Sequence, residues 1–136
     1  MDLSSEIGET PNGLKAVFTT GEMLYPQQRK LLSDRFNAPV YSYYGSNEIG
    51  GIAFECEQGE KHVTDEHILL ETLDDNGQPV WDQPGRIVLT DLDNHAMPLI
   101  RYELGDEGIL TREPCVCGRT HTRLLRLIGR GQEYLE

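Results

Sequence analysis

Small polar side chains and a carboxylate directly follow one of the predicted strands. The segment is Tyr43-Tyr44-Gly45-Ser46-Asn47-Glu48. Glycine permits a sharp turn, an aromatic ring can cover a base, small polar side chains can reach phosphate oxygens, and a carboxylate can hold a hard cation. The segment can therefore contribute to a nucleotide site, although an ordinary polar loop after a strand has a similar composition.

Two other segments carry groups that would complement it. Gly21-Glu22-Met23 follows an earlier predicted strand, and its glycine would let a planar ligand approach the backbone. Arg101-Tyr102-Glu103-Leu104-Gly105-Asp106 lies between two predicted strands, and an aspartate after a glycine turn can accept hydrogen bonds from two vicinal ribose hydroxyls. Taken singly, the first also fits a plain strand-to-helix turn and the second a hairpin turn.

Three cysteines and a histidine form a candidate metal-binding set. Cys56 ends a predicted strand, and His62 follows six positions later. Cys115 and Cys117 form a separate Cys-x-Cys pair, and an odd number of cysteines argues against a disulfide framework. Three thiolates and one imidazole complete a tetrahedral shell for a structural zinc ion. Two alternatives stay open: His121 as the fourth ligand, or three unrelated cysteines that bind nothing.

The elements that would position these segments begin with a βαβ unit in residues 14–50. Residues 1–13 contain turn-forming residues and little apolar patterning, and we expect them to be a mobile lead-in. A strand is predicted over 14–20, a helix over 25–36 and a second strand over 39–44. Ligands bind beyond the carboxyl ends of parallel strands, so the loops after both strands should be neighbours.

Residues 51–129 have the pattern of a β-rich subdomain. Turn residues separate short apolar segments, and Asp75-Asn76-Gly77 is a typical hairpin turn. The predicted strands cover residues 51–55, 68–73, 85–89, 99–102, 108–111 and 123–129. The predicted fold class is therefore α/β passing to mainly β, and residues 130–136 form a short polar end.

Size and charge exclude several classes of function. The chain has 136 residues, enough for one domain but few for an enzyme that holds several substrates together. Its 23 acidic and 12 basic residues give a net charge of −11, which opposes binding to a nucleic-acid backbone. No apolar run is long enough to span a bilayer, and the N-terminal residues carry no export signal. We expect a cytoplasmic protein without nucleic-acid or membrane partners.

Taken in order, the three polar segments resemble consecutive signature motifs of the adenylate-forming (AMP-forming) acyl-CoA ligases. The motifs are Gly-Glu after a strand, Tyr-Gly-x-x-Glu, Arg-Tyr-x-x-Gly-Asp and the Ile-Gly-Arg of residues 128–130. Residues 114–120, Pro-Cys-Val-Cys-Gly-Arg-Thr, resemble a stretch of the phenylacetate-CoA ligase and capsule-biosynthesis branch. The resemblance covers roughly residues 14–136. It implies a fragment: the βαβ part of the large nucleotide-binding domain, then a distorted barrel-like β subdomain that ends at the hinge.

The resemblance also implies roles in holding adenosine. Gly21, Glu22 and Tyr44 correspond to residues that line the adenine pocket. Asp106 would hold the ribose, and Arg130 would reach the ribose or a phosphate. ATP and AMP are therefore the nucleotides implied.

The phosphate and metal contacts come from the segment after the second strand. By resemblance, Gly45, Ser46 and Asn47 contribute to nucleotide binding, with Ser46 and Asn47 facing phosphate oxygens, and Glu48 is the catalytic residue that binds magnesium. In the family reaction a carboxylate attacks the α-phosphate of ATP to give an acyl-AMP and pyrophosphate, and the thiol of coenzyme A then displaces AMP. The branch also includes members with a Cys/His cluster, which supports zinc.

The chain departs from the family pattern in ways that affect catalysis. The phosphate loop with its lysine and the C-terminal domain with a catalytic lysine are not among these residues, so we expect no turnover from the isolated chain. Asn47 stands where the family has Thr or Ser, and Gln132 stands at the position of the hinge aspartate. The alternatives are a non-catalytic, zinc-stabilised binding or scaffold domain, or a capsule-biosynthesis relative. The acid substrate is not identified, and a homo-oligomer is possible.

Overall fold

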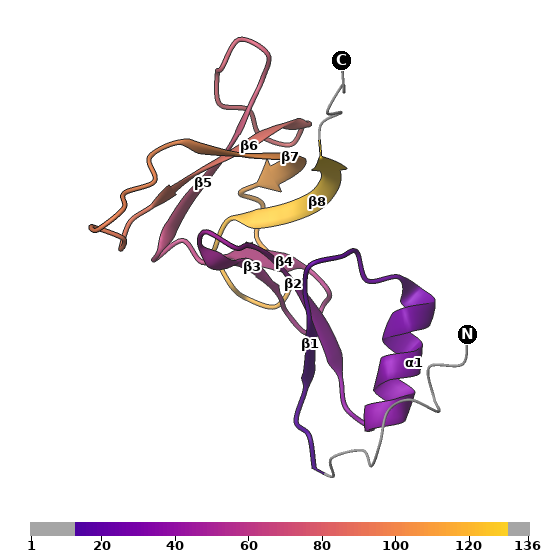
Figure 1. Cartoon of the computed structure of the whole chain (residues 1–136). Helices are drawn as coiled ribbons and strands as arrows, with labels where there is room; N and C mark the ends of the chain where they lie inside the picture. Colours follow the sequence, from indigo (N-terminus) through magenta and orange to yellow (C-terminus); the bar gives the residue numbers. More distant parts are fainter. Residues whose placement is uncertain (1–12, 131–136) are drawn as a thin grey trace, which may run out of the picture. The chain divides into compact units, whose positions relative to one another are not determined.

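The structure, a computed structural model, describes residues 13–130. The predicted lead-in and hinge, including Gln132, therefore lie almost wholly outside the described residues. The chain separates into two compact units, residues 1–42 and 43–136, with the boundary inside strand β2 (Val40–Ser46) (Figure 1).

The first unit contains β1 (Val17–Thr19), α1 (Pro26–Phe36) and the beginning of β2. β1 pairs in parallel with β2, with Thr19 opposite Ser42. Helix α1 begins at Pro26, whose missing N–H costs nothing in the first turn, and ends before Asn37, which adopts a left-handed conformation. The predicted strand–helix–strand order with parallel strands is confirmed.

The second unit is an antiparallel sheet. Beyond β2 its strands are β3 (Gly50–Glu55), β4 (Lys61–Val63), β5 (Ile68–Leu73), β6 (Gly85–Asp91), β7 (Tyr102–Thr111) and β8 (Arg123–Arg130). They pair in the order β2-β3-β4-β8-β7-β6-β5, and β1 adds in parallel beside β2. The sheet therefore has two edges and is mixed, and the predicted passage from α/β to mainly β is confirmed.

Apolar side chains from the antiparallel strands form the core of the second unit. The fully buried members include Ile52, Ile87, Leu89 and Leu110, and they pack with the half-buried Trp81. On β6, Ile87, Val88 and Leu89 are consecutive buried residues, so both faces of the sheet are covered there. This core fixes the strands that carry the candidate site residues.

Two details of the predicted β region were wrong. Residues 99–102 and 108–111 were expected to be separate strands joined by a turn at Gly105, but β7 is continuous from Tyr102 to Thr111. Gly105 has a φ of 77° inside that strand, and the register with β8 shifts after Glu107. A glycine inside a strand can mark a bulge instead of a turn. The three-residue strand β4 was not predicted, because so short a segment shows no periodicity.

No helix within residues 13–130 is long and apolar enough to cross a membrane.

Candidate functional site

Tyr44 and Asp106 join two of the predicted motif segments. The Tyr44 hydroxyl on β2 donates a hydrogen bond of 2.7 Å to Asp106 Oδ2 on β7. Tyr44 belongs to the buried core. Burial first, and then the Asp106 carboxylate, raise the pKa of the Tyr44 hydroxyl, so it stays protonated and remains a donor. The structure therefore brings these two motif residues into direct contact within the second unit.

Arg130 lies beside the same aspartate. It is opposite Asp106 in the β7–β8 register, and its Nε is 4.0 Å from Asp106 Oδ1. The Arg130 side chain is 80% exposed, so this ion pair contributes little to stability. Its guanidinium is available to a ligand.

Glu48 lies on the turn between β2 and β3, and its side chain is exposed. Its own backbone N–H first, and then the Ser46 side chain, hold the pKa of the Glu48 carboxyl below its usual value. Arg130 acts on it electrostatically in the same direction. Arg130 therefore lies within electrostatic reach of Glu48 and Tyr44, and beside Asp106. The ionised Glu48 has the chemistry to hold a divalent cation.

The turn expected at Gly45 lies further along the chain. Gly45 lies inside β2, and the turn comes after Ser46. A Cβ at Gly45 would lie 2.3 Å from the carbonyl oxygen of Gly50 on β3, so the hairpin needs glycine for close backbone approach. Asn47 is exposed on the following turn.

Gly21 and Glu22 lie on the loop after β1, in the first unit. Both are exposed, and Gly21 has a φ of 90°, which favours glycine there. Their contact with adenine stays a prediction.

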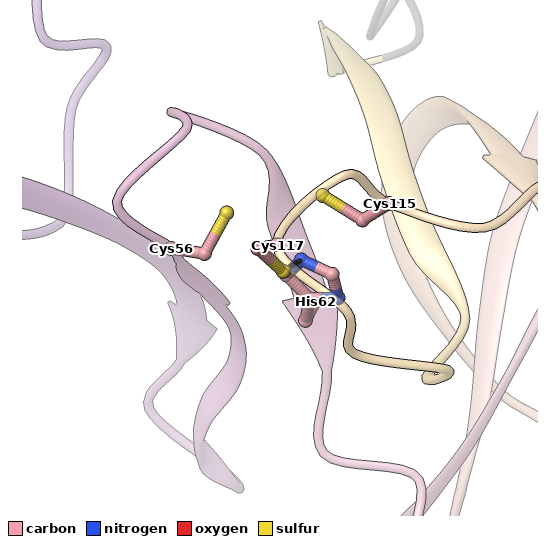
Figure 2. A group of neighbouring side chains, drawn as sticks. All are labelled: Cys56, His62, Cys115 and Cys117. Carbon is pink, nitrogen blue, oxygen red and sulfur yellow. Dashed lines mark hydrogen bonds between the residues drawn. The ribbon is translucent and has the colours of Figure 1, made fainter.

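The Cys/His set is brought together in the second unit. The ligand atoms of Cys56, His62, Cys115 and Cys117 all lie within 4.8 Å of one another, and the side chains turn toward one another (Figure 2). Cys56 follows β3, His62 is on β4, and the two other cysteines are on the turn between β7 and β8. Cys56, His62 and Cys115 are buried, and Cys117 is half-buried. Three separate parts of the chain thus converge.

Local turns explain why the cysteines face inward. The Gly59 N–H donates to the Cys56 carbonyl at 2.9 Å, and the Gly118 N–H donates to the Cys115 carbonyl at 3.0 Å. Both glycines have a positive φ, which an L side chain would strain. His121, the alternative fourth ligand, lies outside the cluster and contacts Glu66 Oε1 at 2.9 Å.

The donor set fits zinc. Zn–S bonds of about 2.3 Å imply tetrahedral edges of roughly 3.8 Å, within the spacing of these atoms. His62 Nε2 is 3.4 Å from Cys117 Sγ, and His62 Nδ1 is buried without a hydrogen-bond partner among residues 13–130. Burial first, and then nearby cationic groups led by Arg119, lower the pKa of His62, which favours the neutral ring that a metal requires. The cluster offers four ligands and no open position.

The chain is similar in sequence to several curated proteins, although no family model matches it. A phenylacetate-coenzyme A ligase of Thermus thermophilus is 38% identical over 113 residues, 79% of this chain and 25% of that protein. The Escherichia coli phenylacetate-coenzyme A ligase is 31% identical over the same shares. Protein CapK of Staphylococcus aureus is 26% identical over 100% of this chain and 29% of its own length. The chain spans about a quarter of the length of these relatives.

Solved structures give the same result. A 2-hydroxyisobutyryl-CoA ligase in complex with 2-HIB-AMP and CoA matches with a TM-score of 0.75 and 28% identity, over 87% of this chain and 30% of that chain. A benzoate-CoA ligase from Burkholderia xenovorans matches with a TM-score of 0.56 and 17% identity, over 86% of this chain and 26% of that chain, which shows a shared fold. The predicted resemblance to a segment of these ligases is confirmed.

Proposed function

We propose that this chain is the adenosine- and magnesium-binding segment of an AMP-forming acyl-CoA ligase, of the phenylacetate-CoA ligase type. The observation that carries the proposal is the hydrogen bond from Tyr44 to Asp106, which joins the second and third motif segments. The similarity to the phenylacetate-coenzyme A ligases and to a CoA ligase structure that holds an acyl-AMP and CoA supports it. In the parent protein the substrates are then ATP, a carboxylic acid and coenzyme A.

The proposed roles follow from the free atoms in the site. Asp106 Oδ2 is engaged by Tyr44, so Oδ1 is the oxygen that accepts from a ribose hydroxyl. Arg130 neutralises charge beside it, and the ionised, exposed Glu48 holds magnesium. The resemblance assigns Ser46 and Asn47 to the phosphate oxygens; Asn47 is exposed, whereas Ser46 Oγ is buried. Gly21 and Glu22 lie in the first unit, and their roles stay predictions from the resemblance.

The chain supplies positioning and charge neutralisation to the reaction. Phosphoryl-group chemistry depends on in-line placement and on neutralising the phosphate oxygens more than on covalent help. The lysine-bearing loop and domain of the family pattern are not among these 136 residues. We therefore propose that the isolated chain binds nucleotide and does not form the thioester.

Thermal unfolding of the purified chain tests this proposal. ATP with Mg²⁺ should raise Tm more than ATP without added Mg²⁺, since a ligand that binds only the folded state stabilises it. E48Q should remove the magnesium-dependent part, and D106N should remove most of the shift with AMP. D75N, which changes an exposed carboxylate on the β5–β6 loop, is the matched control. Identical curves with and without nucleotide would reject the proposal.

A second function is favoured by the Cys/His cluster: a zinc-stabilised interaction domain without catalysis. The cluster is a closed set of four ligands, as in structural zinc sites, and would fasten the turn between β7 and β8 to the end of β3. Zinc stabilisation without any nucleotide shift would select this alternative.

A further inference from the structure

The Cys/His cluster, once it holds the zinc proposed above, carries net negative charge. Three thiolates and a neutral imidazole around a divalent ion leave a charge of about −1. Such a charge in a largely buried place needs compensation from nearby donors or cations. The inference below rests on the proposed metal centre and concerns the residues around it.

Two of the three sulfurs have an N–H donor close to them. The Gln58 backbone N–H donates to Cys56 Sγ at 3.4 Å. Arg119 Nη1 donates to Cys117 Sγ at 3.7 Å. Donors to sulfur stabilise thiolates over thiols. These two donors would offset part of the negative charge of a loaded cluster.

Arg119 connects two parts of the chain. The same Nη1 that contacts Cys117 also donates to Glu57 Oε2 at 3.3 Å. Cys117 lies on the turn between β7 and β8, whereas Glu57 lies on the turn between β3 and β4. Both side chains of this pair are about half-exposed, so the ion pair alone is weak in water. The contact instead holds the turn that carries Cys115 and Cys117 beside the segment that carries Cys56 and His62.

Arg123 is a second arginine beside the cluster, and its side chain is more buried than that of Arg119. It lies opposite His62 in the β4–β8 register, and its side chain is only 14% exposed. Its nearest carboxylate is Glu60, with 3.9 Å between Nη1 and Oε2, and its Nε is buried without a hydrogen-bond partner among residues 13–130. One long ion pair poorly compensates a buried guanidinium. Cys115 lies in the same cluster as His62, the register partner of Arg123, and its thiolate is the second anionic group available to this guanidinium.

We propose that Arg119 and Arg123 are positioning residues of the metal centre. Arg119 links Cys117 to Glu57, and Arg123 lies opposite the ligand His62 and pairs with Glu60. They neutralise the anionic cluster and hold the Cys-x-Cys turn beside the segment that carries Cys56 and His62. Both effects slow loss of the metal. A planar guanidinium serves two acceptors at once, which an ammonium does less well.

Zinc release from the loaded chain tests the proposal. The probe is zinc alone, transferred to an excess of a chromophoric chelator, with release followed by absorbance. R119Q and R123Q should release zinc about 10-fold faster, the lower end of the effect of residues outside the ligand shell. R119K should fall between R119Q and the unchanged chain. R126Q, an exposed arginine on the same strand as Arg123, should release zinc at the unchanged rate.

Cobalt substitution provides a readout that separates positioning from ligand loss. The thiolate-to-cobalt absorption of R119Q should keep the intensity of a three-thiolate site while release is faster. Because R123Q removes a largely buried cation and can unfold the chain, E57Q is added. It leaves Arg119 in place without its glutamate and should also speed release.

The outcomes are distinct. An unchanged chain that holds no zinc rejects the metal centre and this inference with it, and leaves nucleotide binding untouched. A chain that holds one zinc, with R119Q and E57Q releasing it at the rate of R126Q, rejects the role of the arginines alone.

Discussion

Asp106 accepts a hydrogen bond from the Tyr44 hydroxyl at 2.7 Å, although the two residues are 62 positions apart and their strands are not neighbours in the sheet. The contact orients a carboxylate that would otherwise rotate freely. One oxygen is fixed against the core, and the other faces the Arg130 side. The buried Tyr44 thus orients the carboxylate of Asp106, the residue proposed to bind the ribose.

Removal of this hydroxyl should therefore weaken both stability and nucleotide binding. Y44F should lower the free energy of unfolding by about 1–3 kcal/mol, since the lost hydrogen bond goes to a charged acceptor. Urea denaturation measures this change. Y43F is the matched control, because Tyr43 stacks on Phe54 through its ring. Equal effects of Y44F and Y43F would contradict the role of the contact.

Zinc retention should depend on His62 and not on His121. H62A should lose zinc, because its ring is one of four converging ligands, whereas H121A should retain one zinc per chain. Chelation of zinc from the unchanged chain should lower the free energy of unfolding by about 4 kcal/mol when free zinc had exceeded Kd about 1000-fold. Metal analysis and urea denaturation provide the two measurements. Zinc loss in H121A with retention in H62A would reverse the ligand assignment.

Stability should respond to pH through His67 and Asp93. The hydrogen bond and charge of Asp93 raise the pKa of His67 above its usual value of 6.5. Their stabilisation is therefore fully present below pH 6.5 and is lost as pH rises through the folded pKa. NMR titration should show D93N returning the His67 pKa toward its usual value, with D75N unchanged. A His67 pKa that is the same in D93N would disprove the coupling.

Gly45 should tolerate no side chain. G45A should destabilise the second unit by at least about 2–3 kcal/mol, because the added Cβ would lie 2.3 Å from a backbone oxygen that cannot rotate away. G77A, where a Cβ meets open space and only the positive φ of 75° opposes it, should cost about 1 kcal/mol. Denaturant midpoints compare the two. G45A less harmful than G77A would show that β3 moves easily.

Much of the fold is predictable where the apolar pattern is clear. The strand expected at residues 68–73 has the observed bounds of β5, because buried and exposed positions alternate at its start and turn residues follow it. The break expected at Gly105 was wrong, since a glycine turn and a glycine bulge look alike in one sequence. The distinction depends on the partner strand, which local pattern does not reveal.

In the candidate site, too, the residue types could be predicted from the sequence but their contacts could not. Residue types and motif order pointed to Tyr44 and Asp106 separately, but the bond between them joins strands that only the tertiary fold brings together. The choice between His62 and His121 depended on β4, whose three residues give no periodic signal and which pairs with β8. Donor chemistry can be inferred from a sequence, whereas the selection among equivalent donors comes from long-range strand pairing.

The shortness of β4 has a consequence for how the chain folds. Its pairing with β8 brings His62 opposite Arg123, and Cys56 and Cys115 are 59 positions apart along the chain. Closing so long a loop costs entropy that a three-residue strand recovers poorly. A metal ion bound by both Cys56 and Cys115 would act as a cross-link that closes this loop. Metal binding would then help β4 and β8 to pair during folding.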